Sequence, residues 1–284
     1  MEKTAIIDAH ALAYTAKHSL TGEVWEEYKT GVMFGFLLQF LNLSNQLKVK
    51  KFVFAWDSKY SLRKNIYPDY KSNRKKTEQT EEERQRDLIA FSQFREIRLK
   101  ILPGLGFKNN FMVHGFEGDD VIASIVNNNA GPFVVLTSDN DLFQLLKQNH
   151  CDIYLLNKKK LVTQFSFFAE YGIQPSAWAQ VKTIGGCKTD AVPGIRGIGE
   201  KSAIKYLKGL LKGKSLEKVL EGKDSREVEI YRELVTLPFL GMPVVKLKKQ
   251  PPLSFMNIDF VLDRYGFPSL AKGKYLDVWV KMVN

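Results

Sequence analysis

The chain has 284 residues, of which 44% are hydrophobic and 26% are charged, and its formal net charge is +11 at pH 7. This composition excludes a disordered chain and predicts one sizeable core with a smaller appended unit. The positive charge favours a polyanionic partner, because clustered lysine and arginine release counterions when they meet phosphates. Cys151 and Cys187 are far apart and lack metal-site spacing, which excludes a disulfide scaffold and favours a reducing cytoplasm. The chain begins without a signal region and contains no apolar run of about 18 residues, so we expect a soluble protein that does not enter a membrane.

Two apolar runs in the first 60 residues each end in an aspartate. Residues 4–7 lead into Asp8, and residues 51–56 lead into Asp57, so both runs are typical of buried strands with a carboxylate at the carboxyl end. Between them, residues 30–47 place apolar side chains at helical spacing, which predicts a helix that covers the sheet.

Residues 59–76 combine basic and aromatic side chains. They contain seven lysines and arginines against one acid, with three tyrosines between them. Cations bind the phosphate backbone and rings stack on bases, so this pattern is typical of a segment that binds single-stranded nucleic acid. A solvated loop is the alternative. A helix over 84–101, ended by Pro103 and Gly104, follows.

The chain is organised around residues 115–124, where Glu117, Asp119 and Asp120 stand at the head of an apolar-periodic helix. Carboxylates this close repel one another unless a cation lies between them, and Mg²⁺ or Mn²⁺ is the usual one. The alternative is a solvated helix start, where acidic residues suit the helix dipole.

The central segments alternate between strands and helices. Strands are expected over 111–115 and 133–137, and the second is followed by Asp139 and Asp141. Alternating strands and helices predict a mostly parallel sheet with helices on both faces, whose sites form outside the carboxyl ends of the strands. Asp8, Asp57, the 117–120 cluster and the 139/141 pair are therefore expected to face one crevice.

Beyond residue 150 the pattern becomes helical, with segments expected over 164–171 and 175–184. Residues 193–207 read as a glycine-rich hairpin between two helices, and Gly194, Gly197 and Gly199 allow unusual backbone angles or close approach. Exposed amides at the next helix start, followed by Lys201, Ser202 and Lys205, would form a clamp for a phosphate backbone. Residues 182–249 carry 15 basic against 8 acidic side chains, which supports that interpretation.

Five stretches resemble the structure-specific 5′-nucleases, a family that includes flap endonucleases, bacteriophage 5′-3′ exonucleases and the 5′-nuclease domain of bacterial DNA polymerase I. The stretches are IIDAHALAY, FAWDSKYSLRKNIYPDYKSNR, GFEGDDVIAS, LTSDNDLFQLL and DAVPGIRGIGEKSA, in the family's order over about residues 4–210. The resemblance implies a PIN-like or resolvase-like α/β core at 1–170, with a helical arch at about 58–105. It also implies a helical DNA-binding region at 171–284, with a helix–hairpin–helix at about 187–209 that often binds K⁺.

The resemblance also implies roles for individual residues. Asp8, Asp57, Glu117, Asp119, Asp120 and Asp139 would hold a first metal ion, and Asp141 and Asp190 would hold a second, with Asp139 shared. Lys71 would offset charge on the scissile phosphate. The expected DNA contacts are Arg63, Lys64, Tyr70, Lys71 and Arg74 in the arch, with Gly197, Gly199, Lys201 and Ser202 in the hairpin.

Two departures from the family pattern stand out. Where the family reads GD-x-x-DN, this chain reads GGCKTDA, and we interpret Gly186 as the residue in place of the first aspartate, with Asp190 as the second. The second metal position is then expected to be weakened. Thr15 stands where the family has an arginine after IIDAHALAY.

The sequence therefore predicts a Mg²⁺-dependent 5′-3′ exonuclease or flap endonuclease, with Mn²⁺ able to substitute, that cuts 5′ flaps and nicked or branched duplex DNA. We expect a monomer in the cytoplasm, or in the host cytoplasm if a phage encodes the protein. The alternatives are a DNA-binding paralogue of the same fold that has lost turnover, and a PIN-like ribonuclease. The hairpin favours a DNA nuclease over a ribonuclease. The intact set of carboxylates for the first metal ion favours an active enzyme over an inactive paralogue.

Overall fold

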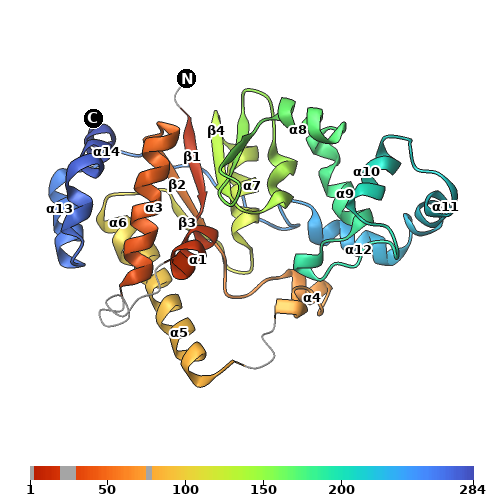
Figure 1. The fold of residues 1–284 in the computed structure, drawn as a ribbon, viewed down its shortest axis with the longest axis horizontal. Coiled ribbons are helices and arrows are strands. Elements are labelled where there is room, and N and C mark those ends of the chain that lie inside the picture. Colours follow the sequence, from red (N-terminus) through yellow and green to blue (C-terminus); the bar gives the residue numbers. More distant parts are fainter. Residues whose placement is uncertain (1–2, 20–29, 75–78) are drawn as a thin grey trace. The chain divides into compact units, whose positions relative to one another are not determined.

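A computed structural model describes residues 3–19, 30–74 and 79–284 (Figure 1). Its sheet has six strands in the order β3-β2-β1-β4-β5-β6. Strands β1 and β2 pair in parallel, as do β4 and β5, whereas β6 pairs antiparallel with β5. The expected α/β class with a mostly parallel, helix-flanked sheet is confirmed.

The chain forms two compact units that interleave along the sequence. Unit 1 comprises residues 1–56, 78–111 and 246–284, and unit 2 comprises 57–77 and 112–245. The division predicted from the sequence, at residue 170, separates a nuclease core from a DNA-binding region. The two units are instead defined by compactness, so that division stays a prediction. Thr21, Gly22, Lys75 and Lys76, which belong to predicted turn and basic segments, lie outside the described residues.

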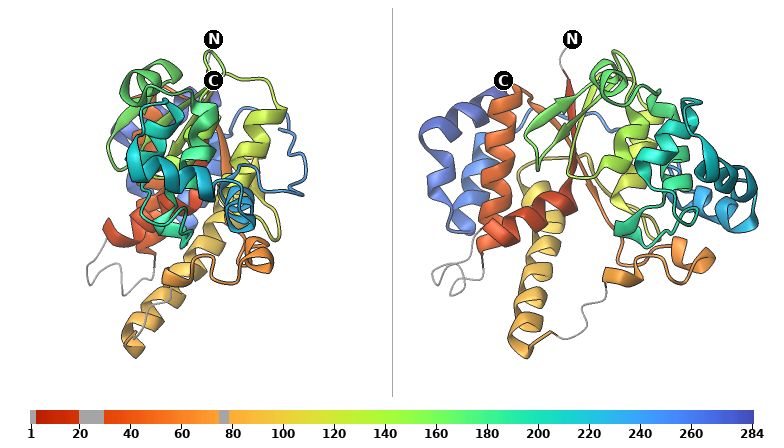
Figure 2. Two further views of the ribbon diagram at one scale, coloured as in Figure 1. Left: turned by 90° about the vertical axis from the view of Figure 1, so that its right-hand side faces the viewer. Right: turned by 45° about the vertical axis from the view of Figure 1, so that its right-hand side comes forward.

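Unit 1 packs aromatic side chains of helix α3 onto strand β2. Phe40 of α3 meets Phe52 of β2 with ring centroids 4.7 Å apart, and Phe36 lies over Trp56 at 5.9 Å. Helices α13 and α14 lie beside α3 (Figures 1 and 2). The elements are β1 (Thr4–Asp8), α1 (Ala9–Ser19), α3 (Gly31–Leu47), β2 (Lys51–Trp56), α5 (Glu81–Glu96), a π-helical turn (Ile97–Ile101), α6 (Leu102–Gly104), α13 (Phe255–Arg264) and α14 (Gly273–Val283); β3 (Asn110–Met112) ends just beyond the unit.

Unit 2 holds the other half of the sheet and a group of short helices (Figure 2). Strand β4 is buried along its whole length, as a strand in the middle of a parallel sheet must be. The elements are α4 (Arg63–Ile66), a 3-10 turn (Ser72–Arg74), α7 (Gly118–Asn128), β4 (Phe133–Thr137), a 3-10 turn (Asn140–Leu145), β5 (Cys151–Leu155), β6 (Lys160–Val162), α8 (Gln164–Tyr171), α9 (Trp178–Gly185), a 3-10 turn (Lys188–Asp190), α10 (Glu200–Leu207), α11 (Gly213–Gly222) and α12 (Arg226–Val235).

Two predicted boundaries change for local reasons. The helix expected over 84–101 begins at Glu81, because Thr80 forms a capping box with Glu83. The strand expected over 111–115 ends at Met112, and Gly115 adopts a φ of 86° in the loop before α7. Over the residues described, no helix is both long and apolar enough to cross a membrane.

Candidate active site

The carboxylates of unit 2 lie where strands end and α7 begins. Asp57 follows β2, and its Oδ1 accepts a hydrogen bond of 2.6 Å from the backbone N–H of Gly118, the first residue of α7. Glu117 immediately precedes that helix, and Asp139 follows β4. The carboxyl ends of the strands therefore gather these acids, as the alternation of strands and helices predicts.

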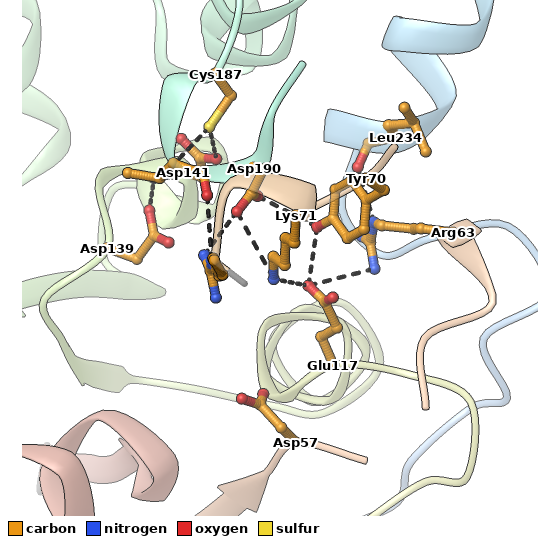
Figure 3. A network of polar contacts seen from close by, with 12 residues as sticks. Asp57, Arg63, Tyr70, Lys71, Glu117, Asp139, Asp141, Cys187, Asp190 and Leu234 are labelled. Atoms are coloured by element: carbon orange, nitrogen blue, oxygen red, sulfur yellow. Dashed lines mark hydrogen bonds and ion pairs between the residues drawn. The ribbon is translucent and has the colours of Figure 1, made fainter. Parts of the chain in front are cut away.

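Lys71 bridges Glu117 and Asp190, which ends the 3-10 turn Lys188–Asp190 (Figure 3). Its Nζ lies 2.6 Å from Oε2 of Glu117 and 3.7 Å from Oδ1 of Asp190, while its backbone N–H donates to the carbonyl oxygen of Asp190. Lys71 adopts a φ of 57°, a conformation that is unfavourable for a residue with a side chain. Arg74 adds a second cation, with Nη2 2.7 Å from Oδ1 of Asp190.

The hydroxyl of Tyr70 lies between the same two carboxylates. It is 3.0 Å from Oε2 of Glu117 and 3.2 Å from Oδ2 of Asp190. A phenol has one hydrogen to donate, so it can satisfy only one of these acceptors at a time. Burial, together with the charges of Glu117 and Asp190, raises the pKa of Tyr70 far above its usual range, so the hydroxyl stays protonated.

Glu117 and Asp190 differ in how their charge is balanced. Burial alone would raise the pKa of Glu117, but the cations Lys71 and Arg63 outweigh it and lower that pKa. For Asp190 burial is the larger effect, and its pKa is raised even though Lys71 and Arg74 act in the opposite direction. Additional positive charge near Asp190 would therefore favour its ionised form.

Both carboxylate oxygens of Asp120 accept hydrogen bonds from other parts of the protein. Arg63 donates from Nη1 to Oδ2 at 2.6 Å and from Nη2 to Oδ1 at 2.7 Å, and the backbone N–H groups of Glu117 and Phe239 donate to the same two oxygens. Asp120 is 0% exposed and Arg63 is 2% exposed. The Nε of Arg63 donates to the carbonyl oxygen of Leu234 (Figure 3).

These contacts bear on three predicted roles, which stay predictions. Four donors leave Asp120 no oxygen directed at a shared ion, so we interpret it as a structural partner of Arg63. Arg63, which was predicted to contact DNA, directs its guanidinium at Asp120 instead of at solvent. Tyr70 is only 2% exposed, so its ring cannot stack on a base in this arrangement.

Asp139 and Asp141 lie at the start of the 3-10 turn after β4. Oδ1 of Asp139 accepts a hydrogen bond of 2.7 Å from the backbone N–H of Asp141. Burial, with the nearby charge of Asp141, raises the pKa of Asp139. Like charges in a buried position are the arrangement that a cation would stabilise.

Asp141, Cys187 and Asp190 form a group of ligand atoms that all lie within 4.8 Å of one another. The thiol of Cys187 lies 3.4 Å from Oδ2 of Asp141 and 3.1 Å from Oγ1 of Thr189. Burial and the two aspartates raise the pKa of Cys187 to about 12. Lys182 of α9 faces the same group, with Nζ 3.0 Å from Oδ1 of Asp141. Burial alone would lower the pKa of Lys182, but the charges of Asp141 and Glu200 together outweigh it and raise that pKa.

Cys187 and Lys182 were not predicted as site residues, and Cys187 corrects the interpretation of Gly186. The family pattern GD-x-x-DN places its first aspartate three positions before the second, and in this chain that position is Cys187. Gly186 corresponds to the preceding glycine. Its φ is 77°, and a Cβ there would lie 2.6 Å from the carbonyl oxygen of Pro193.

Gly186→Asp is therefore expected to destabilise the protein by about 1–3 kcal/mol from the backbone angle alone, with a further cost from the steric clash. Gly209→Asp is the matched control, because Gly209 has a φ of 69° and no atom within 4 Å of an added Cβ. Urea unfolding of both variants gives the comparison. Equal stability of the two would show that the contact with Pro193 is not a constraint.

The predicted hairpin lies between α9 and α10. Gly194 and Gly197 adopt φ values of 66° and 80°, and Gly199 is the residue that precedes α10. Lys201 is exposed and Ser202 half-buried in the first turn of α10, and Lys64 is exposed in α4. Their predicted contacts with DNA stay predictions.

Two further predicted metal ligands, Asp119 and Asp8, lie in α7 and at the end of β1. Asp119 is half-buried in the first turn of α7, next to Asp120. Asp8 belongs to unit 1, where it ends β1 and accepts a hydrogen bond of 3.0 Å from the backbone N–H of Ala11. The predicted metal-binding roles of both stay predictions.

Comparison with known proteins identifies the family. The sequence model described as the 5′-3′ exonuclease, N-terminal resolvase-like domain, matches residues 3–172. The chain belongs to this family. DNA polymerase I of Thermus aquaticus is 30% identical over 239 residues, which cover 82% of this chain and 27% of the polymerase. The 5′-3′ exonuclease of Buchnera aphidicola is 25% identical over 258 residues, covering 87% of this chain and 86% of that protein.

The chain spans about a quarter of the length of the Thermus polymerases it matches. Among solved structures, T5 5′-exonuclease with bound zinc has a TM-score of 0.67 at 18% identity and covers 99% of both chains. Human GEN1 in complex with Holliday junction DNA has a TM-score of 0.62 at 17% identity, over 99% of this chain and 71% of GEN1. At these identities the likeness shows that the 5′-3′ exonuclease fold is shared.

Proposed function

We propose that the protein is a divalent-metal-dependent 5′-nuclease that cleaves DNA near junctions between single strand and duplex. The observation that carries the proposal is the set of acids around Lys71: Asp57, Glu117, Asp139, Asp141 and Asp190 gather in unit 2 with a half-buried cation among them. The family relationship supports nuclease chemistry, and the structural relatives with bound metal ions or DNA support both partners.

The donor set fits divalent cations. Carboxylate oxygens dominate it, and these are the ligands that Mg²⁺ and Mn²⁺ prefer. The raised pKa of Asp139, caused by burial and by the charge of Asp141, indicates charge that a cation would balance. A divalent ion bound there would stabilise charge on phosphate oxygens and favour ionisation of a water molecule.

The chain's own residues supply positioning and charge. Lys71 is held by Glu117 and Asp190 and is partly exposed, so its ammonium can meet a phosphate oxygen at the edge of the acid cluster. Stabilising developing charge from a fixed position is commonly the largest contribution of such groups to a rate. Arg74 has a side chain 53% exposed and lies on the solvent side of Asp190, where it can contact the phosphate backbone.

The hairpin and α10 supply the proposed grip on duplex DNA. The exposed Lys201 and the amides at the start of α10 favour phosphate contacts rather than base contacts, so we propose binding without sequence preference. Binding of K⁺ at the hairpin, Mg²⁺ as the specific ion, and action as a cytoplasmic monomer remain part of the proposal.

Cleavage of a labelled 5′-flap substrate, with Mg²⁺ and with chelator, tests the function. We expect cleavage that requires the metal and stops in Asp139→Asn, which keeps an oxygen to accept the N–H of Asp141 but removes the charge. Asp277→Asn, at an exposed position of α14, is the matched control and should cleave normally. Flap binding without cleavage at any concentration of Mg²⁺ or Mn²⁺ would favour the inactive paralogue, and preferential cleavage of single-stranded RNA would favour the ribonuclease.

DNA binding should weaken steeply as salt increases. Each phosphate neutralised by a cation contributes about −0.9 to the slope of log K against log salt concentration on duplex DNA. Lys201→Ala should reduce the steepness by about one such contact, whereas Lys281→Ala, at an exposed position of α14, should leave it unchanged. Fluorescence anisotropy across a salt series measures both. A wild-type slope near zero would contradict the phosphate clamp.

A further inference from the structure

Cys187 changes the chemistry of one metal position in the candidate site. The family pattern has a carboxylate three positions before Asp190, and this chain has a thiol there. The side chain remains directed at the other ligands, because its Sγ, a carboxylate oxygen of Asp141 and one of Asp190 all lie within 4.8 Å of one another. The position therefore keeps three donors in one group but exchanges a hard oxygen for a soft sulfur.

Ligand type selects the ion at such a group. Mg²⁺ binds oxygen and gains little from sulfur, whereas Zn²⁺, Co²⁺ and Cd²⁺ accept thiolate together with carboxylate ligands. We propose that Asp141, Cys187 and Asp190 form a mixed thiolate–carboxylate metal position that takes a thiophilic divalent ion in preference to Mg²⁺. This inference uses the proposed nuclease function only for the presence of a metal at this site.

Binding must rearrange the contacts that the group makes without metal. Formation of the sulfur–metal bond replaces the S–H bond of Cys187, so one proton leaves to solvent for each ion bound. The ammonium of Lys182, 3.0 Å from Oδ1 of Asp141, must give up that contact as the ion approaches. Lys182 also lies 3.3 Å from Oε2 of Glu200, which offers it a second partner at the same place.

The test measures the sulfur–metal bond directly. Co²⁺ or Cd²⁺ bound to thiolate absorbs in the ultraviolet through sulfur-to-metal charge transfer, so either ion is titrated into the whole 284-residue chain while this absorption is followed. We expect the band in the wild type and in Cys151→Ala, because Cys151 is buried in β5 away from this group. Cys187→Ser and Cys187→Asp should lack it. Titration in weak buffer should release one proton per ion in the wild type.

Metal affinity supplies a second measurement. Cys187→Asp restores an oxygen ligand with a charge, so we expect it to bind Mg²⁺ roughly tenfold to a thousandfold more tightly than the wild type, from unit charges about 4 Å apart. Lys182→Met should tighten Cd²⁺ binding, because Asp141 then loses its competing cation. Calorimetry on DNA-free protein measures both, and circular dichroism confirms that each variant is folded.

The outcomes separate this inference from the proposed function. Absence of the charge-transfer band in the wild type, or its loss in Cys151→Ala but not in Cys187→Ser, would overturn the metal position even if flap DNA is cleaved. A band that depends on Cys187 in a protein without nuclease activity would support the metal position and overturn the proposed function.

Discussion

Replacing Asp120 with asparagine is expected to lower the free energy of unfolding by about 3–5 kcal/mol, the usual cost of breaking a buried ion pair. The two oxygens of Asp120 accept hydrogen bonds from four donors, two of them from Arg63. In asparagine an NH₂ group replaces one of these oxygens, so donors would face donors. Urea unfolding followed by circular dichroism measures the effect. From the sequence alone we would expect Asp120→Asn to fold normally and lose only cleavage, and the buried contacts reverse that expectation.

Two further variants make this result decisive. Arg63→Met should destabilise the protein to a similar extent, and the double variant with Asp120→Asn should lose less stability than the sum of the two, because each single change leaves one buried group without its partner. Asp277→Asn should stay within about 0.5 kcal/mol of the wild type, as expected for an exposed position. A stable Asp120→Asn protein that fails to cleave DNA would instead return Asp120 to the metal ligands.

Lys71→Ala should reduce the single-turnover rate of flap cleavage at saturating DNA by a factor on the order of 10²–10³, as expected when a fixed electrostatic donor is removed. The ammonium that bridges Glu117 and Asp190 would be missing, so phosphate charge would develop without that stabilisation. A φ of 57° is unfavourable for alanine as it is for lysine, so the substitution leaves the backbone strain at position 71 unchanged.

Lys64→Ala is the matched control, since Lys64 is exposed in the same basic segment. It should weaken DNA binding slightly and leave the single-turnover rate unchanged. Loss of affinity in Lys71→Ala, with an unchanged rate at saturation, would show that Lys71 only tethers the DNA. Rapid-quench measurements at several DNA concentrations distinguish the two results.

The strands and the acids at their ends could be predicted from the sequence, because the aspartate after each short apolar run marks where the strand ends. Strand β2 and helix α3 begin and end within a residue of the predicted bounds. The start of α5 was predicted three residues late, although Thr80 and Glu83 show the capping signal in the sequence.

The pairing of side chains could not be predicted in the same way. The sequence shows that Asp120 lies at the start of a helix. Its partner Arg63 is 57 positions away, and no local pattern connects the two residues. Lys182 is the one charged residue of α9, which also carries the polar Gln180 and Thr183. A lysine in such a helix fits a solvated face as well as a site. Cys187 was within reach, since counting back three positions from Asp190 would have found it in place of Gly186.

The interleaving of the two units has a consequence for synthesis on the ribosome. Unit 2 is complete once residue 245 has been made, whereas unit 1 also needs residues 246–284. Those last residues include Trp279 of α14, which is fully buried and lies with its ring centroid 6.1 Å from that of Phe40 in α3. The part of α3 that packs against Trp279 must therefore wait for α14 before it is covered, although α3 can already pack on β2. During that interval this part of α3 is exposed to chaperones and to other nascent chains.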